Sequence, residues 1–354
     1  MTEIDDSKGL QVGTTTKGHS RSRRRWFVVV LVAVCVFGGW YFFNRPQVED
    51  RVALQKIMDR GGRVIRSHSD WLNILDYYLG RKPRDPKTAG PVYMTIVRPT
   101  AEDYEAIVGL RTIWNLELYG GSVNEGFLRT INHMPNVSDW NLYDFSMTDE
   151  DLIRFVASLP DPSRLRSLSL RNTTISDRGL KALSKCSSLK SLSIDGSLIE
   201  GNELTALSQL KIQGLSIRHG RLNDAGFRKI VDQWGETLTS LGVDHNPITD
   251  QSLESIGAMP KLSILEVGGT QVTVQGLKKV LDRIPMRSLS LQDLNWTMED
   301  LKSLALDPKV LNTLDLSGWK IGDEDLKFLP DVLVLDLSRT NFTDAGVSEL
   351  AKLL

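Results

Sequence analysis

The sequence has very little cysteine and no excess of charge of either sign. Its 354 residues include two cysteines and carry a net charge of −1 at pH 7. Two cysteines so far apart, Cys35 and Cys186, do not form a disulfide framework. The balanced charge gives no indication of a nucleic-acid partner. The GxSxG, HExxH, P-loop and CxxC motifs are also missing, so no catalytic residue, metal or other cofactor is predicted.

One long hydrophobic run stands out from this ordinary composition. Residues 26–43 (WFVVVLVAVCVFGGWYFF) contain no charged residue. In a helix that rises 1.5 Å per residue, this run spans roughly 27 Å, close to the thickness of the hydrocarbon layer of a bilayer. Aromatic residues at both ends, Trp26 and Trp40, suit the two membrane interfaces. We therefore expect one transmembrane helix at 26–43.

The residues around this run predict its orientation. Four arginines lie directly before it: Arg21, Arg23, Arg24 and Arg25. Only Arg45 follows closely, so the positive-inside rule places the N-terminus in the cytoplasm and the rest of the chain outside it. Residues 1–25 are then a disordered, basic cytoplasmic tail. A cleaved secretory signal is the alternative, but the run ends in bulky aromatic residues without a cleavage site of small residues, which favours an uncleaved signal anchor.

The C-terminal three quarters of the chain contain an internal repeat of about 24 residues. In residues 165–183 (LRSLSLRNTTISDRGLKAL), leucines in an LxxLxL pattern precede an isoleucine and two further leucines at helical spacing. The alternation predicts a short strand with one buried face, and the later leucines predict a short helix. Ten clear units follow this pattern, and a weak one begins at Met94 and Ile96. Together they occupy residues 91–354.

An aspartate follows most of the predicted strands by nine residues, directly before the helical leucines. Its carboxylate could accept hydrogen bonds from the first free amides of the helix, so we interpret it as the N-cap. The aspartates of this set are Asp103, Asp149, Asp177, Asp224, Asp250, Asp323 and Asp344. No unit can bury its apolar stripe alone, so the units must stack. The prediction is an α/β solenoid (a horseshoe), with a concave parallel sheet and convex helices.

The repeat resembles the leucine-rich repeats of the ribonuclease-inhibitor and F-box type, which carry a TxITDxGLxxL segment. The nearest matches are residues 173–183 (TTISDRGLKAL) and 340–350 (TNFTDAGVSEL). The order of basic stretch, apolar helix and repeats is similar to membrane-anchored leucine-rich-repeat proteins of planctomycete bacteria. That resemblance implies a fold and a layout, but it names no function. Residues 44–90 contain no F-box motif.

The two ends of the repeat array differ. Residues 44–90 are expected to form a helical juxtamembrane region that caps the first repeat, with a helix over 47–60, a strand over 63–68 and a second helix after Ser69. The alternative is a separate interaction module at the membrane surface. The sequence stops inside the last repeat at Leu354, so a partner or a second copy could cover this edge.

The concave face is expected to be small and polar, with few large side chains. Binding hot spots usually contain Trp, Tyr or Arg. Four outward strand positions hold such residues: Tyr119, Tyr143, Arg171 and Arg218. We predict that they bind a partner together with His219, Asp244 and His245. The two histidines occupy equivalent positions in neighbouring repeats, where a carboxylate could complete a metal site. Ordinary strand-end histidines are the simpler interpretation.

These features favour a membrane-tethered scaffold for protein–protein recognition that has no catalytic activity. The partner is not identified by any residue. A structural envelope protein that assembles through its C-terminal repeat, as a homo-oligomer, is the second hypothesis. A hydrolase or metal enzyme centred on His219 and His245 is the third.

Overall fold

The computed structural model describes residues 57–60, 62–65, 93–108 and 113–346. All of them belong to one compact unit, Val48–Leu354. The predicted tail at 1–25, the predicted membrane segment at 26–43 and most of the predicted cap at 44–90 lie outside the described residues. Among the described residues, no helix is long and apolar enough to cross a bilayer.

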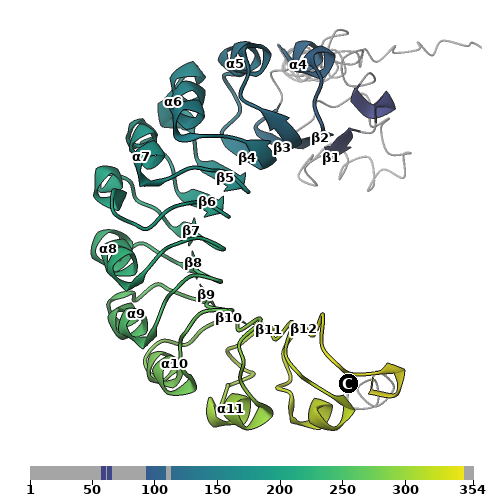
Figure 1. Cartoon of the computed structure of the whole chain (residues 1–354), viewed down its shortest axis with the longest axis vertical. Coiled ribbons are helices and arrows are strands. Elements are labelled where there is room, and N and C mark those ends of the chain that lie inside the picture. The colour runs from purple at the N-terminus through teal and green to yellow at the C-terminus, as the bar shows by residue number, and fades with distance from the viewer. Residues whose placement is uncertain (1–56, 61, 66–92, 109–112, 347–354) are drawn as a thin grey trace, which may run out of the picture. The chain divides into compact units, whose positions relative to one another are not determined.

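Twelve strands form a single open sheet in which their order follows the chain (Figure 1). The eleven strands from β2 to β12 are all parallel, and β1 pairs antiparallel with β2. Each predicted LxxLxL segment holds one strand, and the weak unit at Met94 and Ile96 holds β2. The strands are β1 Arg63–Ile65, β2 Tyr93–Val97, β3 Asn115–Ser122, β4 Asp139–Ser146, β5 Ser167–Arg171, β6 Ser191–Asp195, β7 Gly214–Ser216, β8 Ser240–Gly242, β9 Ile264–Glu266, β10 Ser288–Ser290, β11 Thr313–Asp315 and β12 Val334–Asp336.

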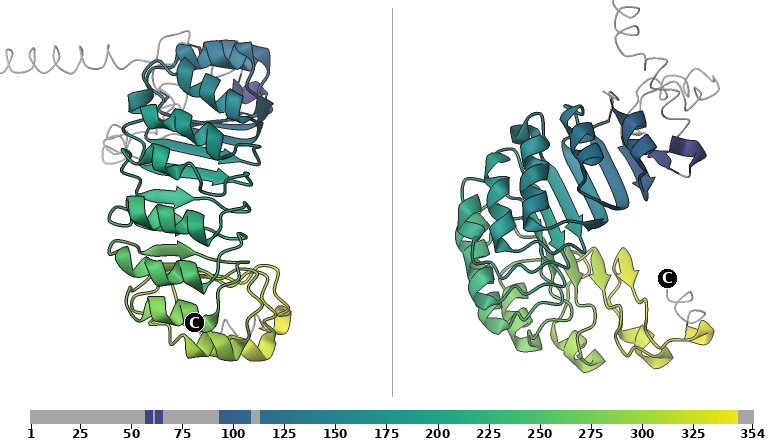
Figure 2. Two further views of the ribbon diagram at one scale, coloured as in Figure 1. Left: turned by 60° about the vertical axis from the view of Figure 1, so that its left-hand side comes forward. Right: turned by 45° about the horizontal axis from the view of Figure 1, so that its top comes forward.

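Helices connect successive strands and lie in a layer on the convex side of the curved sheet (Figure 2). The α-helices are α4 Ala101–Ile107, α5 Glu125–Asn132, α6 Asp149–Ser158, α7 Asp177–Leu180, α8 Asp224–Trp234, α9 Asp250–Ser255, α10 Val274–Leu281 and α11 Met298–Ser303. Short 3₁₀ helices are η2 Pro162–Arg164, η3 Lys181–Lys185, η4 Leu204–Leu207, η5 Ile256–Ala258 and η6 Asp323–Phe328. The predicted α/β architecture, with a concave parallel sheet and convex helices, is confirmed.

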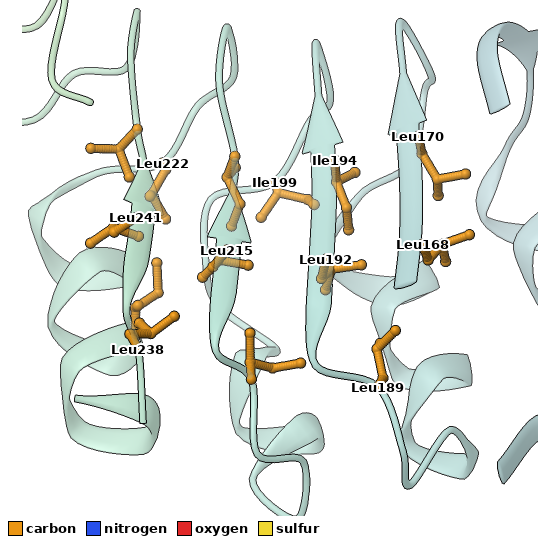
Figure 3. Close-up of a cluster of buried hydrophobic side chains, with 14 of the residues drawn as sticks. Leu168, Leu170, Leu189, Leu192, Ile194, Ile199, Leu215, Leu222, Leu238 and Leu241 are labelled. Carbon is orange, nitrogen blue, oxygen red and sulfur yellow. The ribbon is translucent and has the colours of Figure 1, made fainter. Parts of the chain in front are cut away.

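The core runs along the array between the two layers, and Figure 3 shows the part of it around β5 to β8. Each repeat from β2 to β11 contributes two buried inward residues, such as Leu168 and Leu170 of β5. Burying one leucine side chain stabilises a protein by about 1.5–3 kcal/mol. The buried side chains of neighbouring repeats belong to one continuous cluster, as the stacking prediction required, so the repeats stabilise each other.

Part of the predicted cap is visible at the first repeat. Residues 57–59 are helical, and Ile57 is fully buried in the same core. The predicted strand is present over Arg63–Ile65 and extends the sheet beyond β2. Arg60 forms ion pairs with Glu102 and Asp103 of α4.

The prediction that the repeated aspartates are N-caps is wrong. In most repeats the N-cap is the Thr, Ser or Asn one residue earlier, such as Thr249 before α9 or Ser176 before α7. Asp103 is instead the third residue of α4 and bonds its N-cap Thr100. Most of the other aspartates accept hydrogen bonds from the next repeat, as Asp224 does from the Thr249 amide at 2.9 Å and from its hydroxyl at 2.7 Å. In a Thr-Asp or Ser-Asp pair, both residues are of a type that can cap a helix. The first residue caps the helix of its own repeat, and the aspartate bonds the next repeat.

A glycine in the first turn of the next repeat's helix makes this contact possible. A Cβ atom at Gly276 would overlap the Asp250 carboxylate, which accepts hydrogen bonds from the Thr273 amide and hydroxyl, both at 2.7 Å. Gly179 has the same relation to Asp149. A glycine at this position therefore allows two neighbouring repeats to approach each other closely on the convex side.

Candidate functional site

The concave face presents the first, third and fifth residues of each strand segment. Because the strands pair in register, residues at the same position form rows across the sheet. In the row of fifth positions, Tyr119, Tyr143, Arg171 and Asp195 are direct neighbours on β3 to β6. The four predicted hot-spot residues all lie in this row, but they belong to two separate clusters.

Tyr119, Tyr143 and Arg171 form the first cluster, called here the aromatic cluster. The two tyrosine rings are 5.0 Å apart between centroids, and the Arg171 guanidinium carbon lies 4.9 Å from the Tyr143 centroid. Tyr119 is 36% exposed. Packed rings and a guanidinium lose little conformational freedom on binding, so this cluster is preorganised for contact with a partner.

A buried carboxylate holds the aromatic cluster in place. Glu117 is buried, and it accepts hydrogen bonds from the Tyr119 hydroxyl at 2.6 Å and from the Thr95 hydroxyl at 3.1 Å. The bond to Glu117 is the main reason that the pKa of Tyr119 is raised to about 12. Tyr119 therefore remains a neutral phenol at physiological pH.

Arg218 belongs to a second cluster, which is dominated by carboxyl groups. Its guanidinium is 2.8 Å from Asp195 and 3.4 Å from Glu266, and its side chain is 28% exposed. Asp195 also accepts bonds from Ser216 and from the Arg218 amide. These bonds outweigh the effect of burial and lower the pKa of Asp195. Arg218 is thus largely engaged within the chain, unlike Arg171.

Asp244 and Glu266 form a close carboxyl pair on β8 and β9. Asp244 is completely buried; one oxygen accepts a hydrogen bond from the Gly268 amide at 2.7 Å, whereas Oδ2 has no hydrogen-bond donor. Burial and then the charge of Glu266 raise the pKa of Asp244 to about 7. Burial likewise raises the pKa of Glu266, although Arg218 opposes this. The pair therefore holds a proton more readily than ordinary carboxyl groups do.

The predicted histidine pair lies just beyond the strands. The rings of His219 and His245 stack at 4.2 Å between centroids, and both residues have left-handed backbones, with φ of 51° and 54°. Burial, followed by the charges of His245 and Arg218, lowers the pKa of His219. Nε2 of His245 is 3.2 Å from Asp293.

Glycines let polar side chains in this region interact across two strands instead of one. The pair Arg218–Glu266 passes over Gly242, where a Cβ would lie 2.5 Å from the Glu266 carboxylate. Asp293 bonds Arg339 at 2.9 Å across the intervening repeat, which has Gly318 at that position. The contact from His245 to Asp293 similarly crosses the intervening repeat at Gly269.

The arrangement around the histidines does not resemble a nucleophilic or metal site. In the described part of the chain, no hydroxyl or thiol is hydrogen-bonded to either imidazole, and Nδ1 of His245 has no partner. The same residues include no group of three or more His, Cys, Asp or Glu side chains arranged to hold a metal ion. Asp293 is also neutralised by Arg339. The histidines are placed for stacking on each other and for one contact with Asp293.

A family model described as "Leucine Rich repeat" matches residues 164–184, 236–257 and 330–351. The chain contains leucine-rich repeats. The matched segments include the units of β5, β8 and β12, so they extend from the fourth parallel strand to the last described one. No curated protein matches the sequence.

The structure brings together some predicted site residues and separates others. Tyr143 contacts both Tyr119 and Arg171, and Arg218, His219, Asp244 and His245 lie in the second cluster. The sequence also placed Asp293 beside the two histidines, but it assigned no role to Asp195, Glu266 or Arg339. The outward positions of Asp195 and Glu266 could be read from the strand alternation, but their partners could not.

Proposed function

We propose that this leucine-rich-repeat chain is a non-catalytic scaffold that binds a protein partner on its concave face. The observation that carries this proposal is the aromatic cluster: three preorganised side chains of hot-spot type, accessible on an open sheet of short neighbours. Parallel strands without bulky side chains allow the partner to approach the sheet closely. The absence of catalysis is part of the proposal, and the engaged state of the histidine pair supports it.

The proposal includes a membrane tether. Residues 26–43 span the membrane once, residues 1–25 lie in the cytoplasm, and the repeats lie outside it. The hydrophobic run and its arginine flank support this topology. Alkaline phosphatase, which is active only outside the reducing cytoplasm, can be fused after Leu354. An active fusion is expected; activity of a β-galactosidase fusion at the same point would reverse the orientation.

Site-specific photocrosslinking in the native cell tests the recognition face. One variant of the chain carries a photoreactive amino acid at Ser169, on the concave side of β5. A second variant carries it at Ile153, which is exposed on α6. We expect a discrete adduct from position 169 and none of that mass from position 153. An adduct from the convex position alone would move the site away from the sheet.

Two arginines of the same repeat provide a matched pair for this experiment. Arg171 lies on the concave face and stacks on Tyr143, whereas Arg178 is exposed on helix α7. Arg171→Glu should abolish the adduct, and Arg178→Glu should retain it. Equal loss with both substitutions would indicate a general effect of charge and would contradict the proposal. An adduct that contains two copies of the chain would support self-assembly instead.

A further inference from the structure

The concave face changes in charge along the array. From β6 to β12, the strand segments and the residues directly after them carry six carboxyl groups and two guanidinium groups. The carboxyl groups belong to Asp195, Asp244, Glu266, Asp293, Asp315 and Asp336, and the guanidinium groups to Arg218 and Arg339. We call this region the acidic face. It is distinct from the aromatic cluster on β3 to β5.

Both arginines of the acidic face already form ion pairs within the chain. Arg218 lies between Asp195 and Glu266, and Arg339 makes two hydrogen bonds to Asp293. Among the described residues, no ion pair joins Asp244, Asp315 or Asp336 to a cationic side chain. Asp315 and Asp336 are held by short bonds to the backbone amides of Ser317 and Ser338. The face therefore has more fixed negative charge than the chain neutralises.

Between β8 and β9, two carboxyl groups share one neighbouring guanidinium, that of Arg218. Asp244 is fully buried against Glu266, and its Oδ2 atom has no hydrogen-bond donor when both groups are ionised. Gln292 lies close enough to lower the pKa of Asp244, but not in hydrogen-bonding geometry with Oδ2. A buried acceptor without a donor destabilises the fold, so a cation placed at this point would be stabilising.

We propose that the acidic face binds a basic segment of the partner, with one lysine or arginine side chain directed at Asp244 and Glu266. This inference rests on the proposed function, because it assumes that a partner lies on the concave sheet. The Glu266 carboxylate lies over Gly242, where a Cβ atom would come within 2.5 Å of it, so an incoming cation would meet Glu266 first. Glu266 is 31% exposed, so it offers the outer contact and Asp244 the inner one.

Binding of such a segment should expel the proton that the pair shares. The pKa values of both carboxyl groups are raised, and a neighbouring cation lowers them. Affinity should therefore fall as the pH drops from 8 to 5.5, because protonation then removes the negative charge. The charged groups that act on the pair are Asp195, Arg218 and Asp315.

Fluorescence anisotropy of the full chain with a fluorescein-labelled octalysine peptide tests the acidic face. The variant Glu266→Gln/Asp315→Asn removes two negative charges from the concave side. The control Asp232→Asn/Glu254→Gln removes two from the convex helices α8 and α9. At pH 8 and low salt, we expect the concave variant to bind at least tenfold more weakly and the control less than twofold. Equal weakening would overturn the inference.

The proton released on binding tests the role of the inner pair. Titration calorimetry of octalysine in two buffers with different ionisation enthalpies should show proton release by the unmodified chain at pH 7. Asp244→Asn should abolish most of that release, while His219→Gln/His245→Gln should retain it. Release that follows the histidines, or none at all, would show that the carboxyl pair takes no cation.

The two sets of experiments distinguish failure of the acidic face from failure of the proposed function. If octalysine does not distinguish the two charge variants, but the adduct from position 169 is still lost with Arg171→Glu, the partner docks on the aromatic cluster without a basic segment. If neither the adduct nor the peptide depends on the concave face, both proposals fail.

Discussion

The carboxyl groups of the convex and concave sides belong to the same repeats but have opposite environments. On the convex side, Asp224 accepts three hydrogen bonds from the next repeat, and its pKa is lowered despite partial burial. On the concave side of the following repeat, Asp244 has one unsatisfied oxygen and a raised pKa.

This difference assigns the convex carboxyl groups to stability and the concave carboxyl groups to recognition. The convex aspartates are satisfied by the stack itself and hold one repeat to the next. The concave pair receives the Gly268 amide and the Arg218 guanidinium from other repeats, but Asp244 Oδ2 stays without a partner and the two carboxyl groups repel each other when both are ionised. Groups that conflict with the local packing are characteristic of functional surfaces, where a ligand resolves the conflict.

The most damaging single change should be Gly276→Ala on the convex side. Its Cβ atom would displace the Asp250 carboxylate and break two hydrogen bonds to Thr273, at a cost of about 3 kcal/mol in the free energy of unfolding. Thermal unfolding followed by circular dichroism measures this loss.

Gly257→Ala is the matched control for this substitution. Its nearest neighbour is the flexible end of Arg283 at 3.4 Å, so the change should cost well under 1 kcal/mol. If both glycines tolerate alanine equally, the convex contacts do not require the close approach inferred here.

Much of the fold could be predicted from the sequence because the signal repeats. Ten copies of LxxLxL place the strands, and the period of about 24 residues requires neighbouring strands to pair in parallel. The role of the aspartates could not be predicted in the same way. Thr249 and Asp250, like Ser176 and Asp177, are adjacent residues of N-cap type, and only the position of the next repeat decides between them.

The candidate site was less predictable than the fold. Alternation along the strands identifies Tyr119, Tyr143 and Arg171 as outward residues, and register makes them neighbours. Contacts that pass over a glycine to the second strand, such as Arg218–Glu266, depend on side-chain length and on the missing Cβ of Gly242. Sequence position alone does not contain that information.

A second test of the comparison removes a convex carboxylate. Asp224→Ala should destabilise the chain by about 1–2 kcal/mol at pH 7, because the Thr249 amide and hydroxyl lose their acceptor. The folded-state pKa of Asp224 is lowered, so its contribution is present above the pKa of the unfolded chain and is lost as the pH falls through the folded value. The difference between variant and parent should therefore shrink on acidification.

The control for this test lies on the same helix. Asp232 has a side chain that is 65% exposed and faces only Arg228 at 3.7 Å, so Asp232→Ala should change stability by less than about 0.5 kcal/mol. A loss at Asp224 that persists unchanged at pH 2 would mean that its carboxylate charge is not the stabilising feature.

The smallest expected effect has the opposite sign and belongs to the concave pair. Asparagine at position 244 can still accept the hydrogen bond from the Gly268 amide, while its NH₂ group can donate to Glu266 in place of the repulsion between two carboxylates. Asp244→Asn should therefore raise the stability by about 1 kcal/mol at pH 8.

The pH dependence of this gain follows from the raised pKa of Asp244. An acid whose folded pKa is about 7 binds more protons in the native state, so the parent chain loses stability as the pH rises from about 4 to 7. The advantage of Asp244→Asn should appear over that range and vanish at pH 4, as measured by urea denaturation at several pH values. A variant that is less stable than the parent at pH 8 would show that the Asp244 carboxylate is satisfied within the chain, and it would remove the reason to expect a cation there.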